Sequence, residues 1–346
     1  MKKRTRVQKV SFHLQSGKSP FVIKTDDHDF KLPGIFTFVG NTGSGKTYSC
    51  VALNRYFEDK NYTTRTFLVS ATHPSNPIYK NLDTLSKEDM FEPSVKVMND
   101  VLEEVKKLWK DYKDYTEYCK VYRKYMNHPD FLSVKEEMLL EFHSYEPMKR
   151  VERPRCMVIL DDVQGMGMYT QNPNSIITHM TIKHRHIPLS MCFLVQSWTG
   201  LPRVLRLNTT VFVIFDTSDM KQLIQMYESF GNLVEKEHFI QMFKKAMMTY
   251  KGFLVVDKEP QQEHMRFRNG FHTPFDKSKM MVLQKEQPKN EASNAIRSKK
   301  QSSTSKDAWG VDGDTFSSPS RRSFGPSRGR RRSSQTETAS SRIGGS

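Results

Sequence analysis

The 346-residue sequence has few cysteines and no long hydrophobic run. Its four cysteines (50, 119, 156 and 192) lie far apart, and none forms the C-x-x-C spacing of a disulfide scaffold or a cysteine zinc site. No apolar segment approaches the roughly 20 residues that cross a bilayer. The basic N-terminus is followed by residues 7–14, which alternate like a strand and do not form the apolar core of a secretion signal. We therefore expect an intracellular protein that is neither secreted nor membrane-spanning.

Acidic residues are scarce compared with basic ones, and large apolar residues are scarce near the C-terminus. The net charge is +16, which favours polyanionic partners, nucleic acid first among them. Residues 284–346 contain 13 lysines and arginines against 6 aspartates and glutamates and are rich in serine. Such a segment buries too little apolar surface to fold alone, so we predict a disordered basic tail. Its Arg328–Arg332 run fits a nuclear-import signal, a nucleic-acid-binding arm or a solvating segment equally well.

Residues 40–47 are the most informative stretch. An apolar run, residues 34–39, precedes them and predicts a buried strand, and a helical pattern begins at residue 48. Glycines at these spacings let backbone N–H groups turn toward phosphates, a lysine reaches the β- and γ-phosphates, and a threonine hydroxyl can bind Mg²⁺. The predicted nucleotide-binding residues are Gly40, Asn41, Thr42, Gly43, Ser44, Gly45, Lys46 and Thr47.

Strand and helix patterns alternate along the next 200 residues, which predicts an α/β fold with a mostly parallel central sheet. After residues 34–39, strands are expected at residues 64–70, 156–160, 189–195, 210–215 and 252–256. A long helical region with apolar residues at three- and four-residue steps lies within residues 95–150. Its lysines and tyrosines are compatible with a DNA-contacting lobe, but acidic residues share the same faces, so we favour an ordinary solvated helix.

Three polar side chains at strand ends predict hydrolysis. Asp161 ends one apolar strand, where it can hold the Mg²⁺ that Thr47 also binds, and Asp162 is then free to polarise the attacking water. Gln196 ends the next strand, and the carboxyl ends of parallel strands meet at one edge. Its amide can therefore contact the γ-phosphate or the water.

Charge on the transferring phosphoryl group calls for an arginine. Arg185 lies between a helical stretch and the strand that carries Gln196, a position from which it can reach a neighbouring subunit's nucleotide. Arg203 and Arg206 are alternative candidates for this role. A zinc site formed by the nearby histidines 179, 184 and 186 is a weaker hypothesis, because no cysteine or carboxylate completes the ligand set.

Taken together, these motifs resemble the FtsK–HerA superfamily, and most closely the poxvirus-type genome-packaging ATPases of large DNA viruses, virophages and Polinton-like elements. The resemblance spans residues 35–257 and is carried by the phosphate loop, the strand ending in Asp161–Asp162, and the Arg185–His186 pair before the strand ending in Gln196. It implies a RecA-like (ASCE) P-loop sheet with the Gln196 strand between the strands carrying the loop and Asp161. It also implies a hexameric or pentameric ring with Arg185 acting in trans.

These observations predict three regions: an N-terminal basic segment and strand (1–30), an ATPase domain (31–275) with a helical insertion at about 95–150, and the tail (284–346). The predicted function is an ATP-hydrolysing, Mg²⁺-dependent and DNA-stimulated translocase that packages double-stranded DNA into a capsid. The resemblance implies capsid or portal-vertex proteins as partners and virion assembly sites in the host cytoplasm or nucleus as its location. A small-molecule or nucleotide kinase and a nucleotide-switched DNA-binding scaffold remain alternatives.

Overall fold

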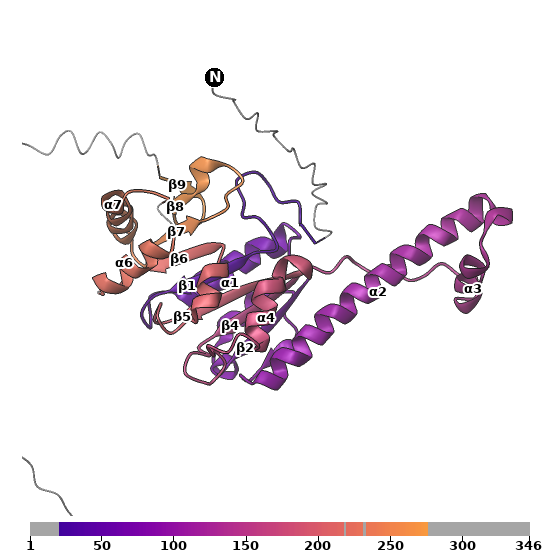
Figure 1. Ribbon diagram of the computed structural model, residues 1–346, viewed down its shortest axis with the longest axis horizontal. Coiled ribbons are helices and arrows are strands. Elements are labelled where there is room, and N and C mark those ends of the chain that lie inside the picture. Colours follow the sequence, from indigo (N-terminus) through magenta and orange to yellow (C-terminus); the bar gives the residue numbers. More distant parts are fainter. Residues whose placement is uncertain (1–20, 218, 231–232, 276–346) are drawn as a thin grey trace, which may run out of the picture. The chain divides into compact units, whose positions relative to one another are not determined.

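The computed structural model describes residues 21–275 except 218 and 231–232 (Figure 1). All of these residues belong to one compact unit, Met1–Glu286. The strand expected at residues 7–14 and the predicted tail at 284–346 lie outside the described residues. The domain boundaries therefore remain predictions.

Nine strands and seven α-helices are present in the described ranges. The strands are β1 (Ile35–Val39), β2 (Arg65–Ser70), β3 (Met90–Phe91), β4 (Cys156–Asp161), β5 (Leu189–Val195), β6 (Val211–Phe215), β7 (Phe253–Asp257), β8 (Phe267–Asn269) and β9 (Thr273–Pro274). The helices are α1 (Lys46–Asp59), α2 (Val95–Asn127), α3 (Val134–Phe142), α4 (Ile176–Lys183), α5 (Arg203–Asn208), α6 (Met220–Ser229) and α7 (Lys236–Met247). None of these helices combines the length and the apolar character of a membrane span.

The strands form one sheet in the order β3-β2-β4-β5-β1-β6-β7-β8-β9. The first six in this order run parallel, and β7, β8 and β9 are added antiparallel. Strand β5 pairs with β1 on one side and β4 on the other, with Val195 opposite Val39 and Leu194 opposite Asp161. This arrangement confirms the expected mostly parallel sheet of a RecA-like P-loop protein, with the Gln196 strand between the other two.

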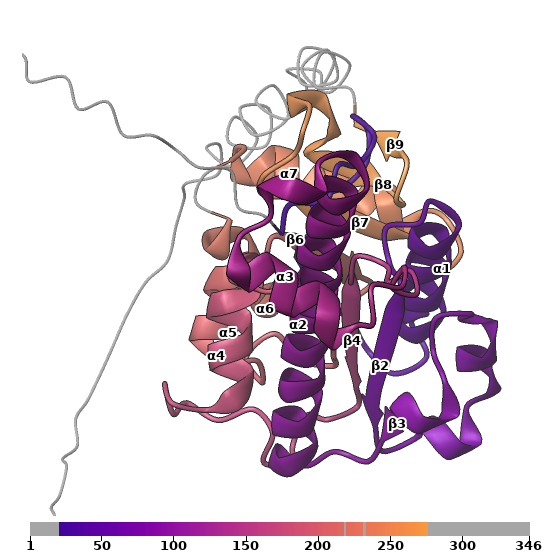
Figure 2. The same cartoon turned by 90° about the vertical axis from the view of Figure 1, so that its right-hand side faces the viewer.

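Helices cover both faces of the sheet because the parallel strands are apolar on both sides. Along β1, Ile35 and Val39 pack into one core cluster, whereas Phe36 and Phe38 pack into the other. Helix α1 closes the Phe36 side, and α4 to α7 with the first half of α2 close the Ile35 side. Figure 2 shows α1 and α4 on opposite sides of the strands. The central strands are therefore rigid supports for the loops at their ends.

Helix α2 is 33 residues long and has two different surroundings. Its first half contributes Met98, Val101 and Val105 to the core on the Ile35 side. Its second half packs on α3 through a separate small cluster of Tyr118, Val121 and Leu140, and Figure 1 shows this half continuing past the sheet. The helical region predicted from the sequence is therefore confirmed as a long helix and a short partner helix.

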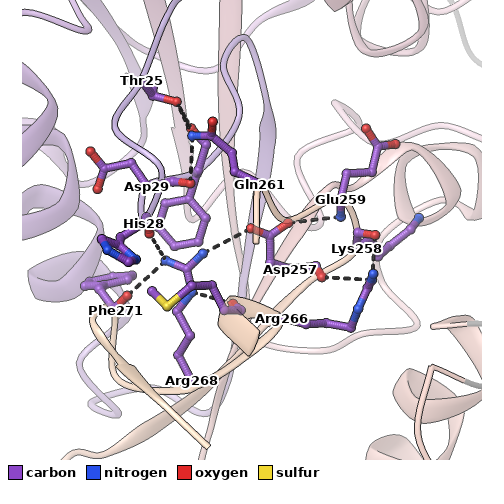
Figure 3. Close-up of polar contacts among 12 residues, drawn as sticks. Thr25, His28, Asp29, Asp257, Lys258, Glu259, Gln261, Arg266, Arg268 and Phe271 are labelled. Carbon is purple, nitrogen blue, oxygen red and sulfur yellow. Dashed lines mark hydrogen bonds and ion pairs between the residues drawn. The ribbon is translucent and has the colours of Figure 1, made fainter. Parts of the chain in front are cut away.

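A buried arginine ties residues 21–34 to the antiparallel side of the sheet (Figure 3). The Arg268 guanidinium, 1% exposed, donates to Asp257 Oδ2 at 3.2 Å and to the carbonyl oxygens of Met265, His28 and Phe271. Gln261 Nε2 adds bonds to the same N-terminal segment, 2.7 Å to Thr25 Oγ1 and 2.6 Å to the Asp26 carbonyl. Because a buried charge needs a complete set of partners, this network fixes the sheet edge opposite the phosphate loop.

Candidate active site

The phosphate loop connects β1 directly to α1, as the strand and helix patterns predict. Gly43 and Gly45 adopt the left-handed backbone conformation, with φ of 78° and 104°, where a side chain would be strained. A Cβ atom on Gly40 would lie 2.6 Å from Phe215 Cβ, so the end of β6 leaves no room for one. Glycine is therefore required at these positions for two different reasons. Gly43 and Gly45 permit the turn, and Gly40 permits close packing against the end of β6.

Lys46 is held against the loop that precedes it. Its Nζ donates to the carbonyl oxygens of Gly40 at 2.8 Å and Asn41 at 2.9 Å. Burial lowers the pKa of the Lys46 ammonium, and the charges of Asp162 and Asp161 act in the opposite direction. The buried Ser44 Oγ has no hydrogen-bond partner among the described residues. A helix N-terminus with a lysine and an unsatisfied hydroxyl is well suited to phosphate oxygens.

Thr47 and Asp161 meet across the sheet edge. The Thr47 hydroxyl donates to Asp161 Oδ2 at 3.1 Å, although the two residues are 114 positions apart. Tyr79 also donates its hydroxyl to Asp161 Oδ2. Burial raises the pKa of Asp161, while the hydrogen bonds from Tyr79 and Thr47 lower it in part. A hydroxyl and a carboxylate in contact are the oxygen ligands that Mg²⁺ prefers, so these side chains fit the metal.

Asp162 and Gln196 form a second pair at the same edge. Gln196 Nε2 donates to Asp162 Oδ1 at 3.3 Å. Asp162 adopts a left-handed backbone conformation, φ 53°, directly after the last residue of β4. Gln164 holds the neighbouring loop, because its Oε1 accepts from the backbone N–H of Gln196 at 3.1 Å and of Ser197 at 3.4 Å. The structure thus brings together all the site residues predicted at this edge.

Arg185 lies at the opposite edge of the sheet, in the short 3₁₀ turn between α4 and β5. It is exposed, and its guanidinium donates to Glu259 Oε1 at 2.6 Å. Strand β5 separates Arg185 from Gln196, and seven residues in a strand span about 20 Å. The structure therefore does not bring Arg185 to the phosphate loop of its own chain.

The alternative arginines differ in their surroundings. Arg203 is exposed at the start of α5, whereas Arg206 lies over the Trp198 ring, 5.5 Å from its centroid. Burial lowers the pKa of the Arg206 guanidinium, and Arg203 adds to this effect. Arg206 therefore has a packing role. The buried His184 gives its Nδ1 to a 2.7 Å hydrogen bond with the Thr181 carbonyl, and in the described ranges no three potential metal ligands cluster.

Two residues of this edge were missed in the sequence. Tyr79 lies in a 3₁₀ turn (Pro77–Asn81) and approaches Asp161 only through the tertiary fold, so no local pattern marks it. Gln164 lies three residues after Asp161, and a Cβ atom on Gly200 would collide with its amide. In the sequence, Gly200 was the one indication that another group, here the Gln164 amide, packs against that position.

The fold and this edge define a P-loop ATPase that binds nucleotide and has an extra strand between the strands that carry the phosphate loop and Asp161. Residues 110–266 match the model of the family described as Poxvirus A32 protein. The match includes Asp161, Asp162, Arg185 and Gln196, and the phosphate loop lies before it. The resemblance to poxvirus-type packaging ATPases is thereby confirmed.

Several solved structures are similar at low sequence identity, and no curated protein matches. The genome-packaging NTPase B204 of Sulfolobus turreted icosahedral virus 2, in complex with AMPPCP, is 14% identical with a TM-score of 0.41, covering 72% of this chain and 100% of B204. EssC (ATPases 2 and 3) from Geobacillus thermodenitrificans is 13% identical with a TM-score of 0.37, covering 78% of this chain and 44% of its own. The pCW3 conjugation coupling protein TcpA is 13% identical with a TM-score of 0.37, and the match covers 77% of this chain and 68% of TcpA. At these values the three structures add nothing to the assignment.

Proposed function

We propose that this protein is a viral genome-packaging motor that hydrolyses ATP to move double-stranded DNA into a capsid. The observation that carries the proposal is the contact between Thr47 and Asp161, with the Gln196–Asp162 pair on the adjacent strand. Two consecutive carboxylates, an amide and a phosphate loop at one sheet edge are the parts that NTP hydrolysis requires. The family match and the +16 net charge support DNA as the partner.

The residues divide into roles along this edge. Lys46 and the loop amides bind the β- and γ-phosphates, and Thr47 and Asp161 hold Mg²⁺, which when bound neutralises charge on the phosphate oxygens. Asp162 accepts a proton from the attacking water, and Gln196 orients that water or the γ-phosphate. Each polar side chain at this edge thus has a role in the proposed reaction. The proposal calls on no other residue of the same subunit.

The position of Arg185 supports a ring of identical subunits. An arginine about 20 Å from its own phosphate loop, on the opposite sheet edge, can stabilise a transition state only in a neighbouring subunit. In a ring with a head-to-tail contact, one edge of each subunit faces the opposite edge of the next. We propose that each site is completed in this way, with capsid or portal-vertex proteins anchoring the ring during assembly in the host cell.

The decisive measurement is steady-state ATP hydrolysis with and without duplex DNA. We expect slow hydrolysis alone and faster hydrolysis with DNA. Lys46→Ala and Asp162→Asn should each lower kcat by at least about a hundredfold, since each removes a group that acts on the transferring phosphoryl group. Phosphorylation of a small acceptor with no response to DNA would instead indicate a kinase. DNA binding that responds to ATP without any hydrolysis would indicate a scaffold.

A further inference from the structure

The turn that joins α7 to β7, residues 249–252, lies at the same sheet edge as the phosphate loop. Strand β7 runs antiparallel to β6, and Phe253 pairs with Phe215. Phe215 is also the residue whose Cβ closes the space beside Gly40. Residues that precede Phe253 therefore lie next to the phosphate loop, on the side away from Asp161.

Lys251 in this turn packs against the start of α1. A Cβ built on Gly45 would lie 3.7 Å from Lys251 Cδ and 3.8 Å from Lys251 Cβ. The turn is also tightly held, because the Gly252 N–H donates to the Thr249 carbonyl at 2.8 Å and a Cβ on Gly252 would lie 2.1 Å from the Ala246 carbonyl oxygen. Lys251 itself keeps a left-handed conformation, φ 51°, which costs free energy in a lysine. The turn thus places a second ammonium group beside the helix N-terminus.

Two aromatic rings are exposed around this lysine. Tyr250 is 88% exposed, and the Lys251 Nζ lies over its ring, 5.5 Å from the centroid. Tyr48 is 70% exposed and lies in the first turn of α1, three residues after the N-cap Gly45 that Lys251 packs against. Large aromatic side chains normally bury most of their surface, and here two of them flank the nucleotide-binding loop.

The direction of a bound triphosphate connects these features. Its γ-phosphate must lie toward Thr47, Asp161 and Gln196, which are on the β4 and β5 side of the loop. The nucleoside end of an extended triphosphate then points to the other side, toward β6 and β7. That is where Lys251 and Tyr250 lie.

We propose that Tyr250 and Lys251 form the nucleoside side of the ATP site. The Tyr250 ring stacks on the base, the Lys251 ammonium pairs with the phosphates nearest the ribose, and Tyr48 borders the same space. Flat aromatic rings stack on any nucleobase, and a lysine is a point charge that suits phosphate. This inference rests on the proposed function, because it assigns the other half of the same site.

The test compares two ligands that differ in the nucleoside. ADP and inorganic tripolyphosphate are titrated by calorimetry into the full-length protein. Tyr250→Ala should weaken ADP binding by about 5- to 150-fold, the range for one base–aromatic stack, and leave tripolyphosphate binding unchanged. Tyr250→Phe should retain ADP affinity. Phe142→Ala, which removes a ring that is 83% exposed on α3, is the matched control and should change neither ligand.

Lys251→Gly tests the charge without disturbing the fold, because glycine adopts the same turn more readily than lysine. It should weaken ADP and tripolyphosphate alike, and the loss should shrink at high salt. ADP affinity that survives Tyr250→Ala, or an equal loss of both ligands, would overturn the base stack. Wild-type protein that binds neither ligand would overturn the proposed function itself.

Discussion

At the scale of single residues, the carboxylate of Asp161 has to satisfy two opposite demands. It is 2% exposed, which favours the neutral acid, yet the proposed role in binding Mg²⁺ requires the ionised form. Two hydroxyl groups, from Tyr79 and Thr47, donate hydrogen bonds to it and favour the charged form. We therefore expect Tyr79 to act as a positioning residue that favours the ionised form of Asp161.

This leads to a prediction about pH. Asp161 binds Mg²⁺ only when ionised, so Mg²⁺-dependent nucleotide affinity should be lost as the pH falls through its raised pKa. Tyr79→Phe removes a hydrogen bond that lowers this pKa and should move the loss to higher pH. Titrations of ADP with and without Mg²⁺ across a pH series measure the midpoint. Tyr56→Phe, which removes a tyrosine–aspartate bond to Asp29 elsewhere, is the control and should leave the midpoint in place. An unchanged midpoint in Tyr79→Phe would contradict this role.

The same residues show what the sequence could and could not predict. The loop at residues 40–47 and the two acids at the end of β4 were predictable, because they combine local motifs with apolar strands. Tyr79 was not, since it reaches the edge through contacts that no local spacing encodes, and for Gln164 the only sequence signal was the glycine at position 200. Lys251 was missed for a similar reason: the antiparallel pairing of β7 with β6, which brings it to the loop, depends on packing and not on pattern.

At the scale of elements, the helical pair of α2 and α3 has a core of its own. Leu140 is fully buried with Tyr118 and Val121, and this small cluster is separate from the two that sandwich the sheet. Ser133 and Glu136 form a capping box that starts α3. Elements that share few buried contacts with the rest of a protein open locally at lower free energy.

Leu140→Ala should therefore loosen this pair alone. Removing a buried leucine costs about 2–5 kcal/mol, and that loss should appear as faster hydrogen exchange in α3 and the end of α2. Met138→Ala, on the exposed side of α3, should leave exchange unchanged. ATP hydrolysis without DNA should be normal in both variants. A loss of basal hydrolysis in Leu140→Ala would show that the pair and the catalytic edge are coupled.

Sequence patterns predicted the long elements better than the short ones. The strands β1, β2, β4, β5, β6 and β7 were predicted within one residue at each end, because each is built around at least three large apolar residues. Strands β3, β8 and β9 were missed: they have only two or three residues each, and β8 is centred on the buried Arg268. The helix α5 was also missed, since its six residues are too few for a periodic pattern.

At the scale of the whole molecule, the two edges of the sheet carry the two parts of the proposed reaction. The edge with Thr47 and Asp161 is the proposed triphosphate site, and the opposite edge presents Arg185, paired with Glu259 on the surface. Exposed ion pairs contribute about 0–1 kcal/mol. The ion pair with Glu259 is thus expected to contribute little to folding, which suits an arginine proposed to act on another subunit.

The Arg185→Ala variant should accordingly bind ATP normally but hydrolyse it at least about a hundredfold more slowly, as expected for loss of a transition-state arginine. Mixed with wild-type subunits, it should lower the ATPase activity of the mixture. Glu259→Gln breaks the same ion pair and keeps the arginine, so it should retain hydrolysis. ATPase rates over a series of mixing ratios provide the measurement. Normal turnover by pure Arg185→Ala protein would transfer the role to Arg203 or Arg206. Equal losses in Arg185→Ala and Glu259→Gln would indicate a structural ion pair.

The long helix α2 extends well beyond its contacts with the core of the sheet. The last α2 residue packed against the core of the sheet, Leu108, is followed by 19 further helical residues, which extend for about 28 Å. A tilt of about 10° at this point would move the far end of the helix by about 5 Å, by the same helix geometry. Such a displacement lies between one and two DNA base-pair steps, which are about 3.4 Å each.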